Sequence, residues 1–216
     1  MQIAILGGTG AEGSGLAFRW AHAGHEVMIG SRSAVKAVEK ATELNGLLNA
    51  EKISGADNHS ASDWADLVVL SVPYSAQEKT LASLTDVLSG KIVMTVVAPL
   101  GKPVARYQRL ESGKSAAEEA QDQLGETARV VAAFQNISAH HLMDLDHTID
   151  CDVLICGAKK DDKAIVAGLC ADAGMRGVNA GSLPNSAVVE GLTAVLIGIN
   201  IRSKIKDAGI RITGLD

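Results

Sequence analysis

The sequence predicts an α/β protein, with a Rossmann-type doubly wound parallel sheet and a smaller C-terminal α/β portion. Short apolar runs alternate with helical patterns along the chain, and a glycine-rich segment joins the first run to the first helix. Hydrophobic residues make up 47% of the 216 residues, yet only 3% are aromatic and 22 are Gly. This composition favours a core of small aliphatic side chains with many tight turns.

The N-terminal half consists of strand patterns followed by helix patterns. Strands are expected at Gln2–Leu6, Glu26–Ile29, Leu67–Val72 and Lys91–Val97, and helices at Ala11–His22, Ala34–Leu48 and Ala76–Leu88. The runs at 67–72 and 91–97 are apolar without alternation, which is typical of strands covered on both faces. We therefore expect these two to be central strands.

The C-terminal half begins after a loop over residues 98–116, which is rich in Pro and Gly. Ser115 and Glu118 have the spacing of a capping box and predict a helix over 115–124. Further strands are expected at 128–134, 152–156 and 177–180, and a further helix at 161–173. The segment from Pro184 to Ile201 is apolar nearly all round, which indicates a helix buried in a core or an interface. We place a cofactor-binding domain at 1–135 and a smaller domain, with dimer contacts, at 136–216.

Charge and hydropathy exclude several partner classes. With 20 basic and 25 acidic residues the net charge is −5, so no overall positive field attracts nucleic acid. The N-terminus lacks a signal-peptide pattern, and the apolar stretch Leu192–Ile201 is shorter than the ~18 residues of a membrane span. Three cysteines fit neither a disulfide set nor a zinc pattern. A cytoplasmic protein with reduced thiols and no metal is expected.

The segment Gly8, Thr9, Gly10, Ala11, Glu12 and Gly13 has the pattern G-x-G-x-x-G. It follows an apolar strand and opens an amphipathic helix, which is the context that dinucleotide binding requires. Glycines there allow the backbone to approach a pyrophosphate, and the free amides of the helix N-terminus bind its charge. The sequence predicts a dinucleotide site at this loop; a glycine-rich turn without ligand is the alternative.

The end of the second strand indicates which dinucleotide binds. An NAD enzyme places an acidic residue there for the ribose 2′-hydroxyl, but this chain has Ser31 and Arg32. Arg32 can donate several hydrogen bonds to a 2′-phosphate, Ser31 offers a hydroxyl, and Lys36 adds a positive charge. We therefore predict NADP rather than NAD, with a solvated basic helix start as the alternative.

Two apolar pairs fall at the expected carboxyl ends of the central strands, where ligands lie in open α/β sheets. Val72 and Pro73 follow the third strand, and Val97 and Ala98 follow the fourth. Their apolar character suits packing against a nicotinamide ring, although a proline can also simply end a strand.

No catalytic triad or metal motif is present in the sequence. There is no G-x-S-x-G nucleophile segment, and the adjacent His140 and His141 would point in different directions on a regular element. No motif marks Tyr74, Lys159 or Lys160 as a proton donor. Hydride transfer between two bound ring cofactors needs mainly that they be held close, so we expect positioning residues rather than a catalytic side chain.

The chain resembles the NADPH-dependent deazaflavin-coenzyme reductases nearly end to end. The segments that carry this resemblance are Ile5–Gly10, Gly15–Ala17, Ala23–Val27, Gly30–Arg32, Ser115–Gln121, Val130–Phe134, Cys151–Gly157, Val189–Thr193 and Ala208–Gly214. The glycine motif is shared by many reductases, whereas Ser115–Gln121 and Val189–Thr193 are more specific to this family.

The resemblance implies reversible hydride exchange between NADPH and an 8-hydroxy-5-deazaflavin co-substrate. It assigns NADP binding to Thr9, Ser31, Arg32 and Lys36, and deazaflavin binding to the neighbourhood of Gln135, Asn136, Ile137, Asn185, Glu190 and Thr193. Family members often have His where this chain has Gln135, and Gln can form hydrogen bonds but cannot carry charge. Glu190 and Asn200 have an alternative role as structural polar groups that tie the apolar helix to a neighbour or a second subunit.

Two other functions stay open at this point. One is an NADPH-dependent reductase of a small carbonyl or imine; such enzymes usually add a large helical substrate domain, and only about 60 residues follow Cys156. The other is a nonenzymatic NADPH-binding redox module. It would bind NADPH without turning over any acceptor.

Overall fold

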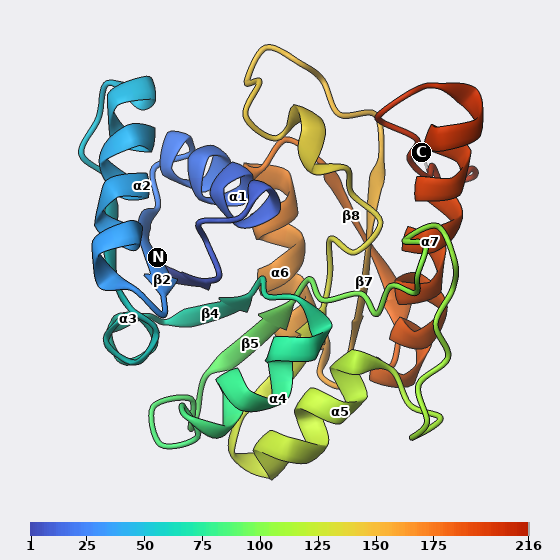
Figure 1. Ribbon diagram of the computed structural model, residues 1–216, viewed down its shortest axis with the longest axis horizontal. Helices are drawn as coiled ribbons and strands as arrows, with labels where there is room; N and C mark the ends of the chain where they lie inside the picture. Colours follow the sequence, from blue (N-terminus) through green and yellow to red (C-terminus); the bar gives the residue numbers. More distant parts are fainter. Residues whose placement is uncertain (216) are drawn as a thin grey trace.

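A computed structural model describes residues 1–215 as one mostly parallel sheet with helices on both faces (Figure 1). Within these residues the sheet has eight strands in the order β3-β2-β1-β4-β5-β6-β7-β8. They are β1 Gln2–Leu6, β2 Glu26–Ser31, β3 Ile53–Asp57, β4 Leu67–Leu70, β5 Ile92–Thr95, β6 Arg129–Ala132, β7 Asp152–Gly157 and β8 Arg176–Gly181. The β6–β7 pair is antiparallel and the other pairs are parallel, which confirms the predicted α/β class.

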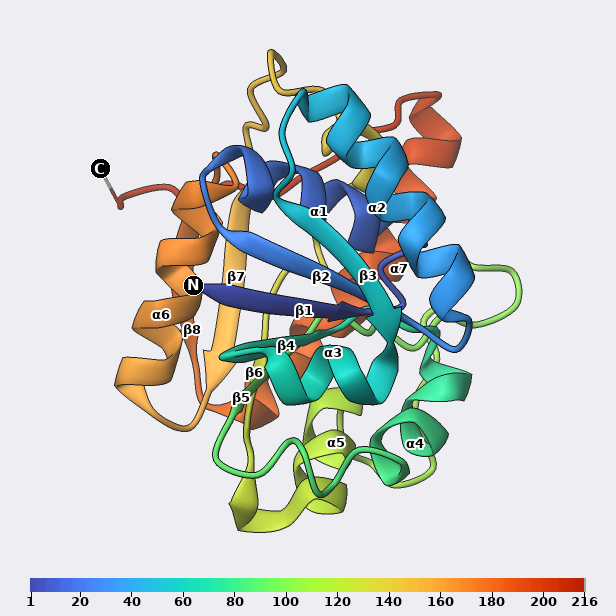
Figure 2. The same ribbon diagram turned by 90° about the vertical axis from the view of Figure 1, so that its left-hand side faces the viewer.

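Helices cover the sheet in two layers, each over its own hydrophobic core. They are α1 Ala11–His22, α2 Ala34–Leu48, α3 Asn58–Trp64, α4 Tyr74–Ala82, α5 Ala116–Leu124, α6 Lys160–Asp172 and α7 Ser186–Ser203, with 3-10 turns η1 Gly125–Thr127, η2 Ala139–His141 and η3 Leu183–Asn185. Figure 2 shows α1 and α2 on one side of the sheet and α3, α4 and α5 on the other. Alternate residues of β1 enter the two cores, Ile3 and Ile5 on the α1 side and Ala4 and Leu6 on the α3 side.

The central strands are where the sequence predicts them. Every residue of β4 and of β5 is buried, as expected for apolar runs without alternation. The capping box at the start of α5 is also confirmed, because the Ser115 hydroxyl accepts from the Glu118 amide and the Glu118 carboxylate accepts from the Ser115 amide.

Strand β3 and helix α3 were not predicted from the sequence, and the expected strands over 67–72, 91–97 and 128–134 and the expected helix Ala76–Leu88 extend beyond the observed β4, β5, β6 and α4. Strand β3 is a short edge strand that contains Gly55 and exposed Ser54, so it lacks a clear apolar pattern. Helix α3 has only seven residues, too few for a visible period. Helix α4 ends at Ala82, whereas the sequence predicts an end at Leu88. Directly after Ala82 the Ser83 hydroxyl donates to the Thr80 carbonyl, and the chain continues in turns.

The sheet continues across the expected domain boundary at residues 135 and 136. After β6 the chain runs through η2 and an irregular segment up to Asp150, and it then returns antiparallel to β6 as β7. Strands β7 and β8 extend the same sheet, with α6 on the α1 side. The division at this boundary stays a prediction.

Buried Arg19, on α1, holds this irregular segment against the sheet. Its side chain is 6% exposed. The guanidinium donates to the carbonyl oxygens of Leu142 (2.9 Å), Ala173 (3.1 Å), His141 (3.0 Å), Asp144 (2.7 Å) and His147 (3.4 Å). The carbonyls of His141 and Asp144 also accept from the amides of Asp144 and His147, so this one side chain ties the turns of the segment to α1.

Helix α7 is buried on one face in the single chain, and the sequence, which is apolar nearly all round, predicts a helix buried in a core or an interface. Ser186, Val189 and Glu190 are buried against the fold, while Val188 and Val195 are 69% and 49% exposed. Among the described residues, Leu183–Ser203 is long and apolar enough to cross a membrane by length and composition, although its inner face packs on the fold. The predicted burial of the outer face therefore requires a partner.

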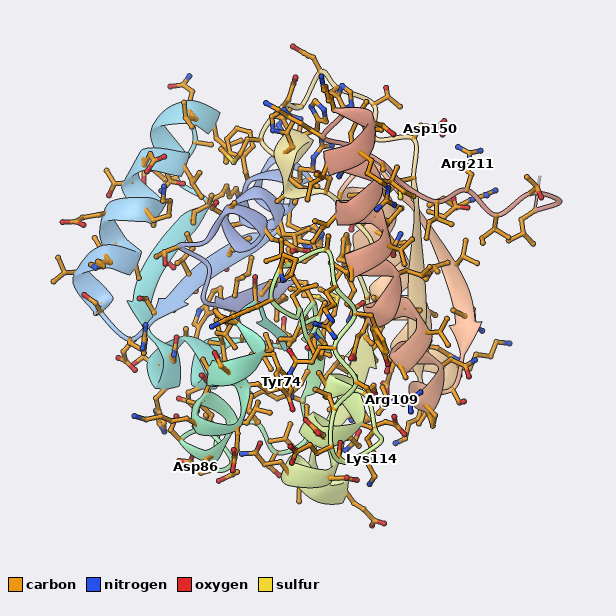
Figure 3. The ribbon with its side chains drawn as sticks, turned by 45° about the vertical axis from the view of Figure 1, so that its right-hand side comes forward. Tyr74, Asp86, Arg109, Lys114, Asp150 and Arg211 are labelled. Carbon is orange, nitrogen blue, oxygen red and sulfur yellow. The ribbon has the colours of Figure 1, made fainter. Side chains whose placement is uncertain are left out.

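Arg19→Met is expected to lower the free energy of unfolding by about 3 kcal/mol, because a hydrogen bond to a charged group is worth roughly 1.5–3 kcal/mol and carbonyls are left unpaired. Urea unfolding of the variant and the parent protein measures the change. Arg109→Met, at an exposed arginine in the loop before α5 (Figure 3), is the control and should stay within about 0.5 kcal/mol of the parent. Equal unfolding curves for all three proteins would contradict the role of Arg19.

Candidate functional site

The glycine loop between β1 and α1 is tight and ends at an uncapped helix. Gly7 has φ +77°, and a Cβ there would lie 2.2 Å from the Ser71 carbonyl oxygen, so only glycine fits. A Cβ on Gly13 would lie 2.8 Å from the Gly8 Cα. Gly10 is the N-cap of α1 and no side chain caps its free amides. The N-terminus of α1 is thus open to an anion.

Two cavities meet at this loop. The side cavity has a volume of about 250 Å³, and its polar lining comes from Thr9, Ser31, Arg32, Asn58, Ser71 and Thr80. The main cavity has a volume of about 420 Å³ and lies beyond the carboxyl ends of β4, β5 and β6, where α7 forms one wall. Both cavities are lined by Gly10, Ser71 and Val72, so a long ligand can extend from one into the other across the N-terminus of α1.

The side cavity presents a free cation at its mouth. Arg32 is exposed and makes no hydrogen bond or ion pair within residues 1–215. Ser31 lies beside it, and its hydroxyl accepts from the Ser33 amide at 3.2 Å. Asn58 contributes a buried Oδ1 that has no hydrogen-bond partner among the described residues. These groups match a phosphate and a hydroxyl donor on one ligand. Lys36 lies on α2, outside the lining of either cavity.

The main cavity brings together residues predicted from four separate segments. Its walls include Gly10, Ala11 and Glu12 from the glycine loop, Val72, Val97 and Ala98 from the strand ends, Gln135, Asn136 and Ile137 after β6, and Thr193 on α7. Pro73 lines the side cavity instead. The apolar valines lie on the strand-end side of the cavity, where the sequence predicts packing against a ring.

Gln135 is held in place by an unusual backbone turn. Phe134 directly before it has φ 72°, a left-handed conformation that is uncommon for a bulky side chain, and its ring is fully buried. The Gln135 Nε2 then donates to the Thr95 carbonyl at 2.8 Å, and the Thr193 hydroxyl donates to the Gln135 carbonyl at 2.7 Å. The Gln135 Oε1 is buried without a partner among the described residues. It is therefore available to a donor on a ligand.

Glu12 is the only ionisable residue that the described structure places in the lining of the main cavity. Its Oε1 is buried and has no hydrogen-bond partner within residues 1–215. Burial raises the pKa of Glu12 from its ordinary value of 4.5 to about 8. The carboxyl group is therefore mostly protonated at neutral pH.

Three of the predicted residues use their side chains within the fold. The Asn136 amide donates to the Asp152 carbonyl at 2.7 Å, and the Asn185 amide donates to the Ala180 carbonyl at 2.7 Å. Glu190 accepts from the amides of Ala116 and Ala117 at 2.8 and 3.0 Å, at the N-terminus of α5. Burial raises the pKa of Glu190 to about 7, and these amide hydrogen bonds oppose the rise. Asn185 and Glu190 are outside the lining of both cavities.

Several lining residues were missed by the sequence analysis. Ser71 lines both cavities, and a small polar residue directly after a buried strand is a signal that could have marked it. Asn58 begins the short helix α3, which was itself missed. Ser138, Leu196, Ile197 and Asn200 line the main cavity from segments far along the chain, and no local pattern distinguishes them.

Three histidines, His140, His141 and His147, lie together outside the lining of both cavities. The His141 ring contacts that of His140 edge-on at 4.5 Å and stacks on that of His147 at 3.8 Å, and its Nε2 lies 3.7 Å from the Asp207 carboxylate. His141, His147 and Asp207 could hold a metal ion by the spacing of their ligand atoms. The expectation of no metal stays a prediction.

Comparisons with known proteins point to one family. A family model described as NADP oxidoreductase, coenzyme F420-dependent, matches residues 2–99. The chain is 40% identical over 222 residues to the F420-dependent NADP reductase of Methanothermobacter marburgensis, covering 100% of this chain and 99% of that protein. It is also 40% identical over 224 residues to that of Methanocaldococcus jannaschii, covering 100% of both.

A solved structure agrees with these relatives over the whole fold. The crystal structure of a putative F420-dependent NADP reductase from Arthrobacter sp. FB24 matches with a TM-score of 0.83 and 25% identity. The match covers 98% of each chain, so β7, β8 and α7 belong to the shared fold.

The Glu12 carboxyl group should make the stability of the free protein depend on pH. The folded-state pKa of about 8 exceeds the ordinary value of 4.5, so the folded protein binds more protons between these limits and its free energy of unfolding falls as pH rises. Glu12→Gln has no carboxyl group to titrate at this position. The difference in free energy of unfolding between Glu12→Gln and the parent protein should therefore shift in favour of the variant as pH rises from 5 to 9. Urea unfolding at several pH values measures the difference. Exposed Glu26→Gln should run parallel to the parent, and parallel curves for Glu12→Gln would refute the assignment.

Proposed function

This chain belongs to the family of F420-dependent NADP reductases, and we propose that it transfers a hydride reversibly between NADPH and coenzyme F420, an 8-hydroxy-5-deazaflavin. It is an NADP-dependent oxidoreductase whose co-substrates are NADP(H) and F420. The observation that carries the proposal is the meeting of two cavities at the uncapped N-terminus of α1. That geometry suits a dinucleotide whose phosphates lie between its two ends.

The NADP would lie across the glycine loop. Exposed Arg32 and Ser31 are placed to bind its 2′-phosphate in the side cavity, and Lys36 adds positive charge nearby. Gly8, Thr9, Gly10 and Gly13 form the loop that approaches the pyrophosphate. The nicotinamide end would enter the main cavity past Val72, Val97 and Ala98, which keep water from the ring. The unpaired Asn58 Oδ1 and the free Arg32 support this fit.

The deazaflavin ring would occupy the remainder of the main cavity. Gln135, Ile137 and Thr193 line that part, and the unpaired Gln135 Oε1 can accept a hydrogen bond from a ring N–H. Asn136 lines the same wall while its amide fixes β7. Asn185 and Glu190 would act indirectly, because they hold η3 and α7 in place. When both rings are bound, the reaction consists of hydride transfer between them, and the protein supplies their alignment.

The two alternatives have less support. A reductase of small carbonyls or imines would need a substrate domain, and the chain instead matches F420-dependent NADP reductases over their whole length. A nonenzymatic NADPH-binding module would not need space for a second ring, such as the part of the main cavity lined by Ile137, Leu196 and Ile197. Purified protein with NADPH and oxidised F420, run beside FMN and FAD, separates the three cases: bleaching of F420 alone supports our proposal. Turnover of imines without F420, or NADPH binding without any turnover, would support the alternatives.

We propose that the protein is a cytoplasmic homodimer that buries the outer face of α7, without membrane or nucleic-acid partners. Val188, Leu192, Val195 and Ile199 recur at helical spacing along this face, and Val188 and Val195 are exposed in the single chain. A second copy would cover this stripe, as the all-round apolar sequence indicates. The inner face carries Glu190 and Ser186 in hydrogen bonds to α5, which favours a helix packed on a water-soluble fold over a membrane span.

Replacing Arg32 with Ala should weaken NADPH binding by about 1.5–3 kcal/mol, the worth of a hydrogen bond to a charged group, and leave NADH binding nearly unchanged. Isothermal titration with both nucleotides measures the two losses. Arg109→Ala, an exposed arginine far from the side cavity, controls for net charge. Equal losses for NADPH and NADH would show that the 2′-phosphate lies elsewhere.

The paired substitution Val188→Asp and Val195→Asp should convert a dimer of the 22.4 kDa chain into monomers, because it places charges in the covered apolar stripe. Light scattering coupled to size exclusion reads the mass directly. Exposed Val35→Asp on α2 should leave the dimer intact. A monomeric parent protein, or one that sediments with lipid vesicles, would overturn this assembly.

A further inference from the structure

Reduction of the deazaflavin requires a proton in addition to the hydride, and alignment of the two rings does not supply that proton. If the proposed function holds, a hydride leaves C4 of the nicotinamide and forms a C–H bond at C5 of the deazaflavin. The two electrons that it carries reduce the conjugated ring, and the ring nitrogen N1 then takes up a proton. NADPH gives only the hydride, so this proton comes from another group. An acid inside the cavity could deliver it without admitting water.

Glu12 is placed on the half of the site where the rings would lie. It lines the main cavity together with Gln135, Val97 and Thr193. It does not line the side cavity, where Arg32 and Thr9 are found. Glu12 therefore lies on the main-cavity side of the glycine loop, away from the residues placed for the 2′-phosphate.

No other residue that lines the main cavity in the described chain can exchange a proton near neutral pH. The strand ends contribute Ser71, Val72, Val96, Val97 and Ala98, and the segment after β6 contributes Gln135 through Ala139. Helix α7 contributes Thr193, Leu196, Ile197 and Asn200. Helix α7 also carries a buried acidic residue, Glu190, but its carboxyl group accepts from amides of α5 and does not line the main cavity.

The surroundings keep Glu12 ready to donate. Its buried Oε1 has no partner within residues 1–215, which is costly unless a ligand supplies one. Burial alone raises its pKa to about 8, without a charged neighbour. An acid with a pKa near the working pH is suited to both giving and taking a proton.

Gln135 complements this group but cannot replace it. Its Nε2 is fixed to the Thr95 carbonyl, and its free Oε1 can only accept. Glu12 and Gln135, each with one buried oxygen that has no partner among the described residues, therefore line the same cavity. This pairing of an acceptor with an acid matches a ring edge that presents both N–H and acceptor atoms.

We propose that Glu12 is the catalytic acid that gives the deazaflavin its proton, and the base that removes it in the reverse direction. In the forward direction the Glu12 O–H bond breaks, an N–H bond forms on the ring, and Glu12 becomes a carboxylate that solvent reprotonates between turnovers. In reverse, the carboxylate takes that proton as the hydride returns to NADP. Electrons move only between the two cofactors.

Glu12→Gln keeps the shape and hydrogen bonding of the protonated group but removes its proton transfer. We expect single-turnover reduction of F420 by NADPH to slow by about 10²–10⁴-fold, the usual contribution of a general acid, with the NADPH Kd unchanged. As pH rises through the Glu12 pKa, the rate of the parent protein should fall for F420 reduction and rise for the reverse reaction. The variant should lose both dependences, and Glu26→Gln should keep them.

A readout that needs no turnover is the infrared carbonyl band of a protonated carboxyl group in the free protein. The parent and Glu26→Gln should show two buried carboxyl bands, one that disappears near pH 7 from Glu190 and one that disappears near pH 8 from Glu12. Glu12→Gln should lose the band that disappears near pH 8 and keep the Glu190 band. A variant that turns over at the parent rate with the parent pH profile overturns the proposal for Glu12 while the hydride transfer stands. A parent protein that never bleaches F420 overturns the proposed function itself.

Discussion

The site depends on the parallel pairing of β1 with β2 on one side and with β4 on the other. The carboxyl ends of all three strands then lie at one edge, and the chain leaves them toward opposite sides of the sheet. The glycine loop fills the resulting crevice, and the free amides of α1 open into it. Side and main cavities are the two halves of this crevice, which explains why they share Gly10, Ser71 and Val72.

Long-range hydrogen bonds then close the main cavity. Glu190 on α7 accepts from the first amides of α5, and Ser186 donates to the Ser115 hydroxyl at 2.8 Å. These contacts fix α7 so that Thr193 reaches the backbone of Gln135. On the other face, Arg19 orders the segment that connects β6 to β7. Outside the lining of both cavities, the Tyr74 hydroxyl (Figure 3) donates to Glu119 and joins α4 to α5. The shape of the main cavity thus rests on contacts between residues far apart in sequence.

The cavities carry polar groups that the fold leaves unpaired. Glu12, Asn58 and Gln135 each have a buried oxygen without a partner among the described residues, and exposed Arg32 has no counterion there. Such groups reduce the stability of the free protein, and folds keep them where ligands supply the missing partners. The left-handed backbone at Phe134 is a further local strain at the same place.

The sequence by itself determined the layered fold and the nucleotide loop, because strand periodicity, the glycine spacing and the Ser115 capping box are local signals. The sequence also predicted that Val72 and Val97 lie at the same edge of the sheet, because each follows a strand of the parallel order, and both line the main cavity. Only the tertiary structure decided which side chains serve the fold and which face the cavity. Glu190 bonds to α5, and Glu12 lines the main cavity with a buried oxygen unpaired among the described residues, because burial and hydrogen-bond partners arise from contacts that no local pattern encodes.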